Sequence, residues 1–207
     1  MKTLMLLSAF TFVLFGCNKN EKPSTNQIED SSIVEEFNDS ISSDKDKYLE
    51  RGKAIAGQAQ GVLGKNLIQA LNAEGPVFAL EFCSAEAIPL TDSAALSSDV
   101  KLKRVSDKNR NPNNVANDKE LKIINLFKSQ INQGVEVKPE VEATEDHYVG
   151  YYPIVTNTMC LQCHGTPKVD INEETYAKIK SLYPADKAFG YDINELRGMW
   201  VVEMKID

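Results

Sequence analysis

Apolar side chains recur at helical spacing in the first half of the chain and predict two consecutive helices. Residues 45–73 carry apolar positions three and four apart, which is typical of a long amphipathic helix. The segment Glu74-Gly75-Pro76 interrupts this pattern, and proline suits the first position of a new helix. A second apolar set follows from Val77 to Ile88, and we expect Pro89 to bend or end the helix that carries it.

The second half of the chain changes to alternating patterns that predict strands with helices between them. The predicted elements are a strand at 101–106, a helix from Asn117 or Asp118 to Gly134, a hairpin of strands at 135–143 and 147–156, a helix at 173–182 and a strand at 197–206. This order predicts an α+β fold in which a long N-terminal helix leads into an antiparallel sheet, with helices packed on one side of the sheet.

The N-terminus has the features of a bacterial export signal. A positive charge precedes an apolar run from Leu4 to Phe15, which is too short to span a bilayer comfortably. The run ends just before Cys17, and this box resembles the cleavage and lipidation site of lipoproteins. We expect a signal peptide at 1–16, lipid attachment at Cys17 and a periplasmic protein anchored to a membrane, with Asn18 favouring the outer membrane. An uncleaved anchor or a plain secretory signal would also export the chain.

The rest of the chain divides into a tether and one domain. Residues 17–44 are polar and acidic, and their apolar residues are too sparse for a core, so we expect a flexible tether. Residues 45–207 carry the organised pattern, and a chain of 207 residues with 42% hydrophobic content can build one core. The net charge of -7 argues against a nucleic acid partner, because phosphate binding requires a basic surface.

The motif Cys160-Leu-Gln-Cys163-His164 carries the candidate chemistry. A c-type haem needs two thiols for thioether bonds to its vinyl groups and an adjacent histidine for its iron, and this motif supplies all three. Zinc is one alternative, but the sequence has no second Cys/His pair to complete a zinc site. A disulfide is another, since an exported protein can form one, although the βαβ pattern of dithiol oxidoreductases is missing. The motif therefore predicts one covalent haem.

The far side of the iron has several candidate ligands, and spacing alone does not choose among them. The candidates are His147, Met159, Met199, Met204 and Cys83, or no side chain at all. Met199 and Met204 lie five apart on a predicted strand, so they face opposite sides and we expect that they are not both core residues. Cys83 is an unpaired thiol in an oxidising compartment, and ligation to iron would explain it.

Several spaced segments carry a resemblance to a known family. They are R-V-S-D-K-N-R-N-P-N-N (104–114), Y-Y-P-I-V-T-N-T-M-C-L-Q-C-H-G-T-P (151–167), Y-P-A-D-K-A-F-G-Y (183–191), L-R-G-M-W-V-V (196–202) and A-L-E-F-C-S-A-E-A-I-P-L (79–90). Together they resemble a bacterial family of exported c-type haem domains with a PAS-like fold. In the last segment Ile88 departs from the smaller residue that is usual in the family.

The resemblance has implications for fold and ligation. It implies a PAS-like antiparallel sheet flanked by helices and one covalent haem, with axial ligation by His164 and by Cys83. Arg104 and Arg110 lie on and after a strand beside an Asn-rich loop, and a guanidinium pairs well with a carboxylate, so both are candidate partners of the haem propionates. Tyr152 is a candidate to pack against the ring.

Thiolate ligation has a functional consequence. A thiolate donates charge and stabilises ferric over ferrous iron, so a low reduction potential is expected. This favours electron transfer with a redox partner protein that the sequence does not identify. A haem-based redox or gas sensor is the alternative. An enzyme is not expected, because only His147 would remain for acid–base chemistry once His164 binds iron.

Overall fold

The structure is a computed structural model that describes the backbone of residues 29–98 and 100–206 and the side chains of 44–96 and 100–206. The predicted signal peptide, Cys17 and the tether as far as residue 28 lie outside the described residues. The chain divides into the units Met1–Asn38 and Asp39–Asp207, and the second unit holds the sheet and the candidate site. Residues 29–44, predicted as tether, have helical backbone. They contain no glycine or proline that would interrupt a helix.

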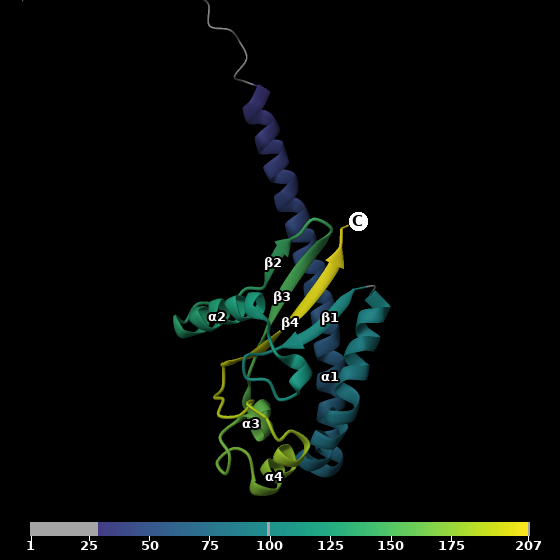
Figure 1. Cartoon of the computed structure of the whole chain (residues 1–207), viewed down its shortest axis with the longest axis vertical. Helices are drawn as coiled ribbons and strands as arrows, with labels where there is room; N and C mark the ends of the chain where they lie inside the picture. The colour runs from purple at the N-terminus through teal and green to yellow at the C-terminus, as the bar shows by residue number, and fades with distance from the viewer. Residues whose placement is uncertain (1–28, 99, 207) are drawn as a thin grey trace, which may run out of the picture. The chain divides into compact units, whose positions relative to one another are not determined.

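Helix α1 (Glu29–Ser98) consists of two segments that meet at Gly75. Gly75 has φ 83° and ψ -169°, a conformation that is essentially restricted to glycine. The chain reverses there, and Figure 1 shows the second segment returning alongside the first. Pro76 begins the second segment, as the sequence predicts, whereas Pro89 lies inside it without ending it.

The remaining elements form one antiparallel sheet with three further helices. They are β1 (Lys101–Val105), the short 3-10 helix η1 (Pro112–Asn114), α2 (Asp118–Asn132), β2 (Glu140–Ala143), β3 (His147–Val155), α3 (Thr158–His164), α4 (Glu173–Leu182) and β4 (Leu196–Lys205). The strand order is β1-β4-β3-β2, and every neighbouring pair is antiparallel. Asn117 caps α2 in a capping box with Glu120. These elements confirm the predicted α+β class, although β2 is shorter than the strand expected at 135–143.

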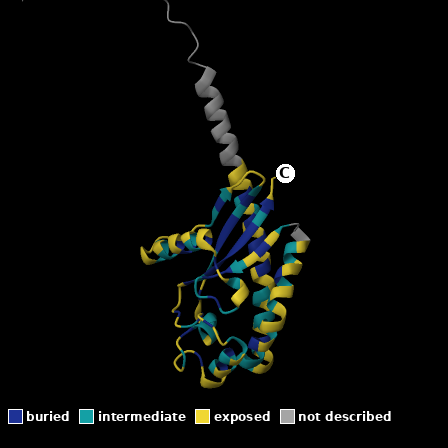
Figure 2. Ribbon diagram, viewed as in Figure 1, coloured by how far each residue is buried: buried dark blue, intermediate teal, exposed yellow. Residues whose placement is uncertain are grey.

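The sheet is covered on both faces, which corrects the expectation of helices on one side. On one face the first segment of α1 packs Tyr48, Ile55 and Ala59 against β3 and β4. On the other face α2 packs Ile124 and Phe127 against β1, β3 and β4. Figure 2 shows the strands as the most continuously buried part of the chain.

Because both faces are covered, the expectation for the strand methionines was wrong. Met199 and Met204 do point to opposite sides of β4, and both are fully buried, each with 0% exposure. Met199 joins the core under α2, and Met204 joins the core under α1. Opposite orientation therefore does not place either of them in solvent.

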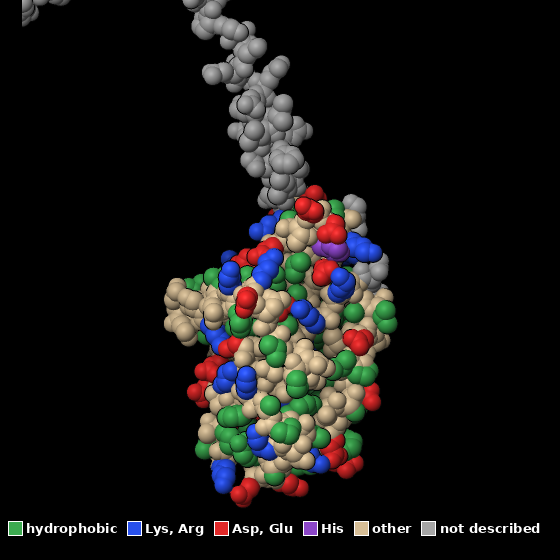
Figure 3. Space-filling view, in the orientation of Figure 1, with side chains coloured by type: hydrophobic (Ala, Val, Ile, Leu, Met, Phe, Trp, Pro, Cys, Tyr) green, Lys and Arg blue, Asp and Glu red, His purple; other side chains and the backbone are tan. Residues whose placement is uncertain are grey.

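The outer surface carries both signs of charge. Lys and Arg side chains alternate with Asp and Glu over the face drawn in Figure 3. No helix in the described part of the chain is long and apolar enough to cross a membrane.

Candidate functional site

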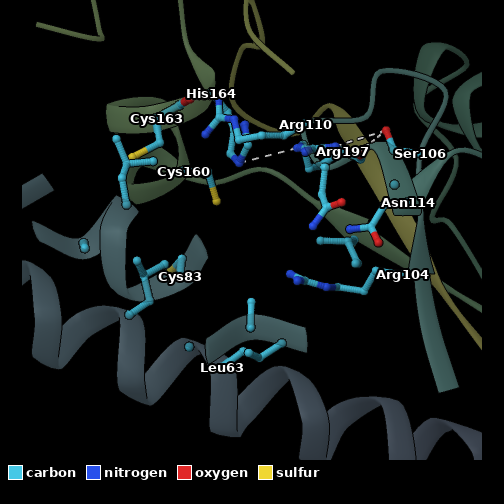
Figure 4. Close-up of a pocket in the computed structure, with 18 of the residues that line it drawn as sticks. Leu63, Cys83, Arg104, Ser106, Arg110, Asn114, Cys160, Cys163, His164 and Arg197 are labelled. Carbon is cyan, nitrogen blue, oxygen red and sulfur yellow. Dashed lines mark hydrogen bonds between the residues drawn. The ribbon is translucent and has the colours of Figure 1, made fainter. Parts of the chain in front are cut away.

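A cavity of about 310 Å³ lies between α1, the strand end of β1 and the α3 region. It brings together five residues that the sequence analysis selected, from three separate segments of the chain: Cys83, Arg104, Arg110, Cys163 and His164. Cys160 lines it as well. Figure 4 shows Cys83 of α1 on one side, the α3 residues opposite it and Arg104 reaching toward the interior from β1.

Helix α3 presents the motif as one face. Asn157 is its N-cap, and the Asn157 side chain accepts a hydrogen bond from the Cys160 backbone N–H at 3.3 Å. Gly165 ends the helix by donating its backbone N–H to the Leu161 carbonyl at 2.9 Å. Cys160 lies three residues before Cys163 and four before His164, so the three side chains share one side of the helix.

The imidazole of His164 is held in one tautomer. Its Nδ1 lies 2.7 Å from the Ala188 carbonyl oxygen. A carbonyl oxygen only accepts hydrogen bonds, so Nδ1 carries the proton and Nε2 keeps its lone pair. Arg197 Nε donates a long hydrogen bond of 3.5 Å to this Nε2 lone pair. Burial lowers the pKa of His164, and the Arg197 and Arg110 cations lower that pKa further, so the ring is neutral.

Two loops close around α3 and fix its position. The segment 183–191 donates the Gly190 backbone N–H to the Gly165 carbonyl at 2.8 Å and the Tyr191 N–H to the His164 carbonyl at 3.0 Å. The Asn-rich loop at 107–114 holds this segment in turn, because Lys108 donates from Nζ to the Phe189 carbonyl at 2.8 Å. Three of the segments that carry the family resemblance thus form one hydrogen-bonded layer.

Arg110 belongs to this layer, and its guanidinium is hydrogen-bonded to other protein groups. Its Nη2 donates to the Cys163 carbonyl at 2.6 Å and to the Ala188 carbonyl at 3.1 Å. Its Nη2 also pairs with the buried Asp186 carboxylate at 3.1 Å. The structure therefore gives Arg110 a place in the support of α3, whereas the sequence suggested a free guanidinium for a propionate.

The Arg104 guanidinium, unlike that of Arg110, faces the cavity without a hydrogen bond to another described residue. Its guanidinium lies over the Trp200 ring, 5.3 Å from the ring centroid. In the described part of the chain it makes no hydrogen bond and no ion pair, although it lines the cavity. Burial lowers the pKa of Arg104, but an arginine remains charged. Arg104 is thus a half-buried cation that faces the cavity without a hydrogen-bonded partner among the described residues.

Cys83 is a free, half-buried thiol on the second segment of α1. Burial raises the pKa of this thiol, while the nearby Arg104 and Arg110 cations oppose that rise. The position agrees with a thiol that meets a bound group from the side opposite α3 (Figure 4).

Of the other residues that the sequence analysis selected, one lines the cavity and the rest do not. Met159 lines the cavity, whereas His147, Met199 and Met204 do not. Tyr152 is not brought to the site either: it is buried in the core, and its hydroxyl donates to the Leu49 carbonyl at 3.0 Å. The side chain of Tyr152 turns toward α1, because its position on β3 faces the core on that side of the sheet.

Sequence reasoning missed Arg197 and Asp186. Arg197 donates from Nη1 to Ser106 Oγ at 3.0 Å and to the Lys108 carbonyl at 3.2 Å, and it lies beside His164. Both residues stand inside segments that carry the family resemblance, but nothing in their spacing links them to the Cys-x-x-Cys-His motif.

The alternatives of zinc and a disulfide find no support in the geometry. Among the residues that the structure describes, no three His, Cys, Asp or Glu side chains gather as ligands of a metal ion. Cys160 and Cys163 are both free thiols.

The comparisons with known proteins show the family and the fold of the chain. The sequence model of the Tll0287-like family matches residues 21–205. The chain belongs to the Tll0287-like family. The crystal structure of the cyanobacterial heme-protein Tll0287 is similar to it, with a TM-score of 0.56 and 19% sequence identity, over 80% of this chain and 96% of that one. No curated protein matches the chain. Family membership confirms the resemblance seen in the sequence, and the similar structure confirms the fold.

Proposed function

We propose that this member of the Tll0287-like family is a monohaem c-type cytochrome. Cys160 and Cys163 would hold the haem through thioether bonds, His164 would bind the iron, and Cys83 would be the second axial ligand. When bound, the haem supplies one-electron redox chemistry. The similar solved structure is of a heme-protein, which supports the same cofactor here.

The residues present fit this cofactor. Two free thiols three residues apart share a face with a histidine whose unprotonated Nε2 accepts only a long hydrogen bond from Arg197, and this single arrangement carries the proposal. Cys83 and Arg104, whose guanidinium has no hydrogen-bonded partner among the described residues, line other walls of the same cavity. Arg104 supplies the positive charge that a propionate requires, while Trp200 supports its guanidinium.

The surroundings of the site favour electron transfer over catalysis. His147 lies outside the cavity, where it contacts Asp146 and Glu203, so it is not placed to act as an acid or base at the cofactor. As an iron ligand, the Cys83 thiolate would favour the ferric state and a low potential. We therefore propose an electron carrier for a redox partner protein. The acidic composition argues against a nucleic acid partner.

The compartment is part of the same proposal. The apolar N-terminal run and Cys17 support export and lipid anchoring in the periplasm, with Asn18 favouring the outer membrane.

The proposal is tested on protein exported from a host that has haem-attachment machinery. A pyridine haemochrome spectrum of the denatured, acid-acetone-washed protein should show one porphyrin per chain. The double variant Cys160→Ala/Cys163→Ala should lose it, and Met159→Leu, a neighbour on the same helix, should retain it. A washed wild-type chain without porphyrin would contradict the proposal.

The same preparation distinguishes the second candidate function. A sensor is favoured by one observation: Cys83 comes from α1 and His164 from α3, so loss of one bond would release a separate element. Slow or no binding of carbon monoxide by the reduced protein is expected of a carrier. Rapid binding would favour a haem-based redox or gas sensor.

A further inference from the structure

The backbone of Ala188 is held by a buried ion pair, at its N–H by one member and at its carbonyl by the other. Asp186 accepts a hydrogen bond from the Ala188 backbone N–H at Oδ1, at 2.8 Å. Arg110 Nη2 donates to the Ala188 carbonyl oxygen at 3.1 Å, and the same Arg110 pairs with Asp186 Oδ2. Ala188 itself has no exposed surface. The orientation of its carbonyl is therefore fixed by these two side chains.

The same carbonyl oxygen is the acceptor for His164. His164 Nδ1 lies 2.7 Å from it, so the imidazole and the Arg110 guanidinium share one acceptor. Arg110 also donates to the Cys163 carbonyl, one residue before the histidine. The pair thus reaches His164 by two routes, through its hydrogen-bond acceptor and through its own backbone.

We propose that Arg110 and Asp186 are positioning residues that set the strength of His164 as an iron ligand. The inference rests on the proposed haem function. A hydrogen bond from Nδ1–H to a carbonyl makes the imidazole a stronger donor at Nε2, and outer partners of this kind tune metal sites. A cation that competes for the same carbonyl weakens that hydrogen bond. Arg110 therefore makes His164 a weaker donor, and Asp186 limits the effect by sharing the charge of Arg110.

The Arg110–Asp186 pair can act on His164 because both side chains are buried. The Arg110 and Asp186 side chains are 11% and 0% exposed, so solvent and salt screen their charges weakly. A buried ion pair is weak evidence for added stability, because desolvation offsets its attraction. Positioning of a ligand explains why the pair lies here, directly behind α3.

Opposite effects are expected for the two members of the pair. Arg110→Gln removes the competing cation, strengthens the Nδ1–H bond and stabilises ferric iron, so the midpoint potential should fall. Asp186→Asn leaves Arg110 uncompensated and should raise it. We expect each to change the ferric-to-ferrous ratio about tenfold, which is about 59 mV for one electron. Loosened packing alone would move both variants in the same direction.

Three measurements complete the experiment. Potentials are measured on holoprotein, hydrogen exchange of the His164 Nδ1–H is followed by NMR, and a haemochrome spectrum verifies the covalent haem in each sample. Lys187→Gln is the matched control, because it removes an exposed cation from the same loop, and its side chain makes no hydrogen bond or ion pair in the described part of the chain. Its potential should shift much less. Arg110→Lys keeps the charge and should shift less than Arg110→Gln.

The outcomes separate this inference from the proposed function. Missing porphyrin in the wild-type chain would overturn the proposed function. Intact covalent haem with potentials of Arg110→Gln and Asp186→Asn that are unchanged, or that move the same way, would overturn the inference. Should the Arg110 variants fail to fold, Asp186→Asn decides alone: an upward shift supports the inference, and a downward or absent shift contradicts it.

Discussion

At the scale of single residues, the site depends on which arginine is free. The Arg110 guanidinium donates hydrogen bonds to two backbone carbonyls and pairs with Asp186. The Arg104 guanidinium only stacks on the Trp200 ring. The sequence treats the two as equivalent, since both flank the same polar loop. Their different hydrogen-bond partners depend on loop 183–191, because the Asp186 carboxylate and the Ala188 carbonyl accept from Arg110.

Cys83 is the residue on which the proposed ligation is most directly tested. In Cys83→Ala the thiolate is lost, so the ferric absorption and electron spin resonance spectra should change to those of a site without sulfur ligation. Ser84→Ala, the next residue on the same helix and also in the cavity wall, should leave both spectra as in the wild type. Unchanged spectra in Cys83→Ala would show that Cys83 is not a ligand.

At the scale of elements, the reversal of α1 at Gly75 delivers Cys83 to the site. The first segment packs on the sheet, and the second returns with Leu80 packed against Ile171 and Ile179 in the α4 region. Without the reversal, a continuous helix would carry Cys83 away from α3. A single glycine with a positive φ therefore connects the helical pattern of the sequence to the geometry of the cavity.

Replacement of Gly75 tests this role. Gly75→Ala forces an alanine into a conformation at φ 83° that costs about 1–3 kcal/mol, so the free energy of unfolding in denaturant should fall by that amount. Gly61→Ala is the matched control: Gly61 lies in the helix with open space around it, and alanine there should raise stability by about 0.5–1 kcal/mol. Equal stability of Gly75→Ala and the wild type would show that the turn tolerates an ordinary residue.

At the scale of the whole molecule, the proposed anchor and the folded unit are separate in sequence. The signal and Cys17 precede residue 29, and the site lies entirely within Asp39–Asp207. Loss of the anchor should therefore leave the haem site unchanged.

Membrane attachment is tested by Cys17→Ser. The wild type should be found in the membrane fraction and be released by detergent, because acyl chains on Cys17 provide stable anchoring. Cys17→Ser, or a chain whose signal is exchanged for a plain secretory one, should appear in the soluble periplasmic fraction with its haem intact. Retention of Cys17→Ser in the membrane would rule out the lipid as the anchor.

The sequence by itself determined the local features of this protein. Helical spacing and alternation predicted most elements, because each pattern reports which side of its own element is buried. Asn117 and Pro76 marked where helices begin, and the spacing of Cys160, Cys163 and His164 predicted a haem motif because all three lie within five residues.

Tertiary structure decided what depends on contacts between distant segments. The second covered face of the sheet buries both Met199 and Met204, and no spacing along β4 could show that a helix lies on each side. The same holds for Tyr152, which turns to the core, and for Asp186, which meets Arg110 across 76 positions of sequence. Periodicity reports burial along one element, whereas a partner is chosen only when separate elements pack together.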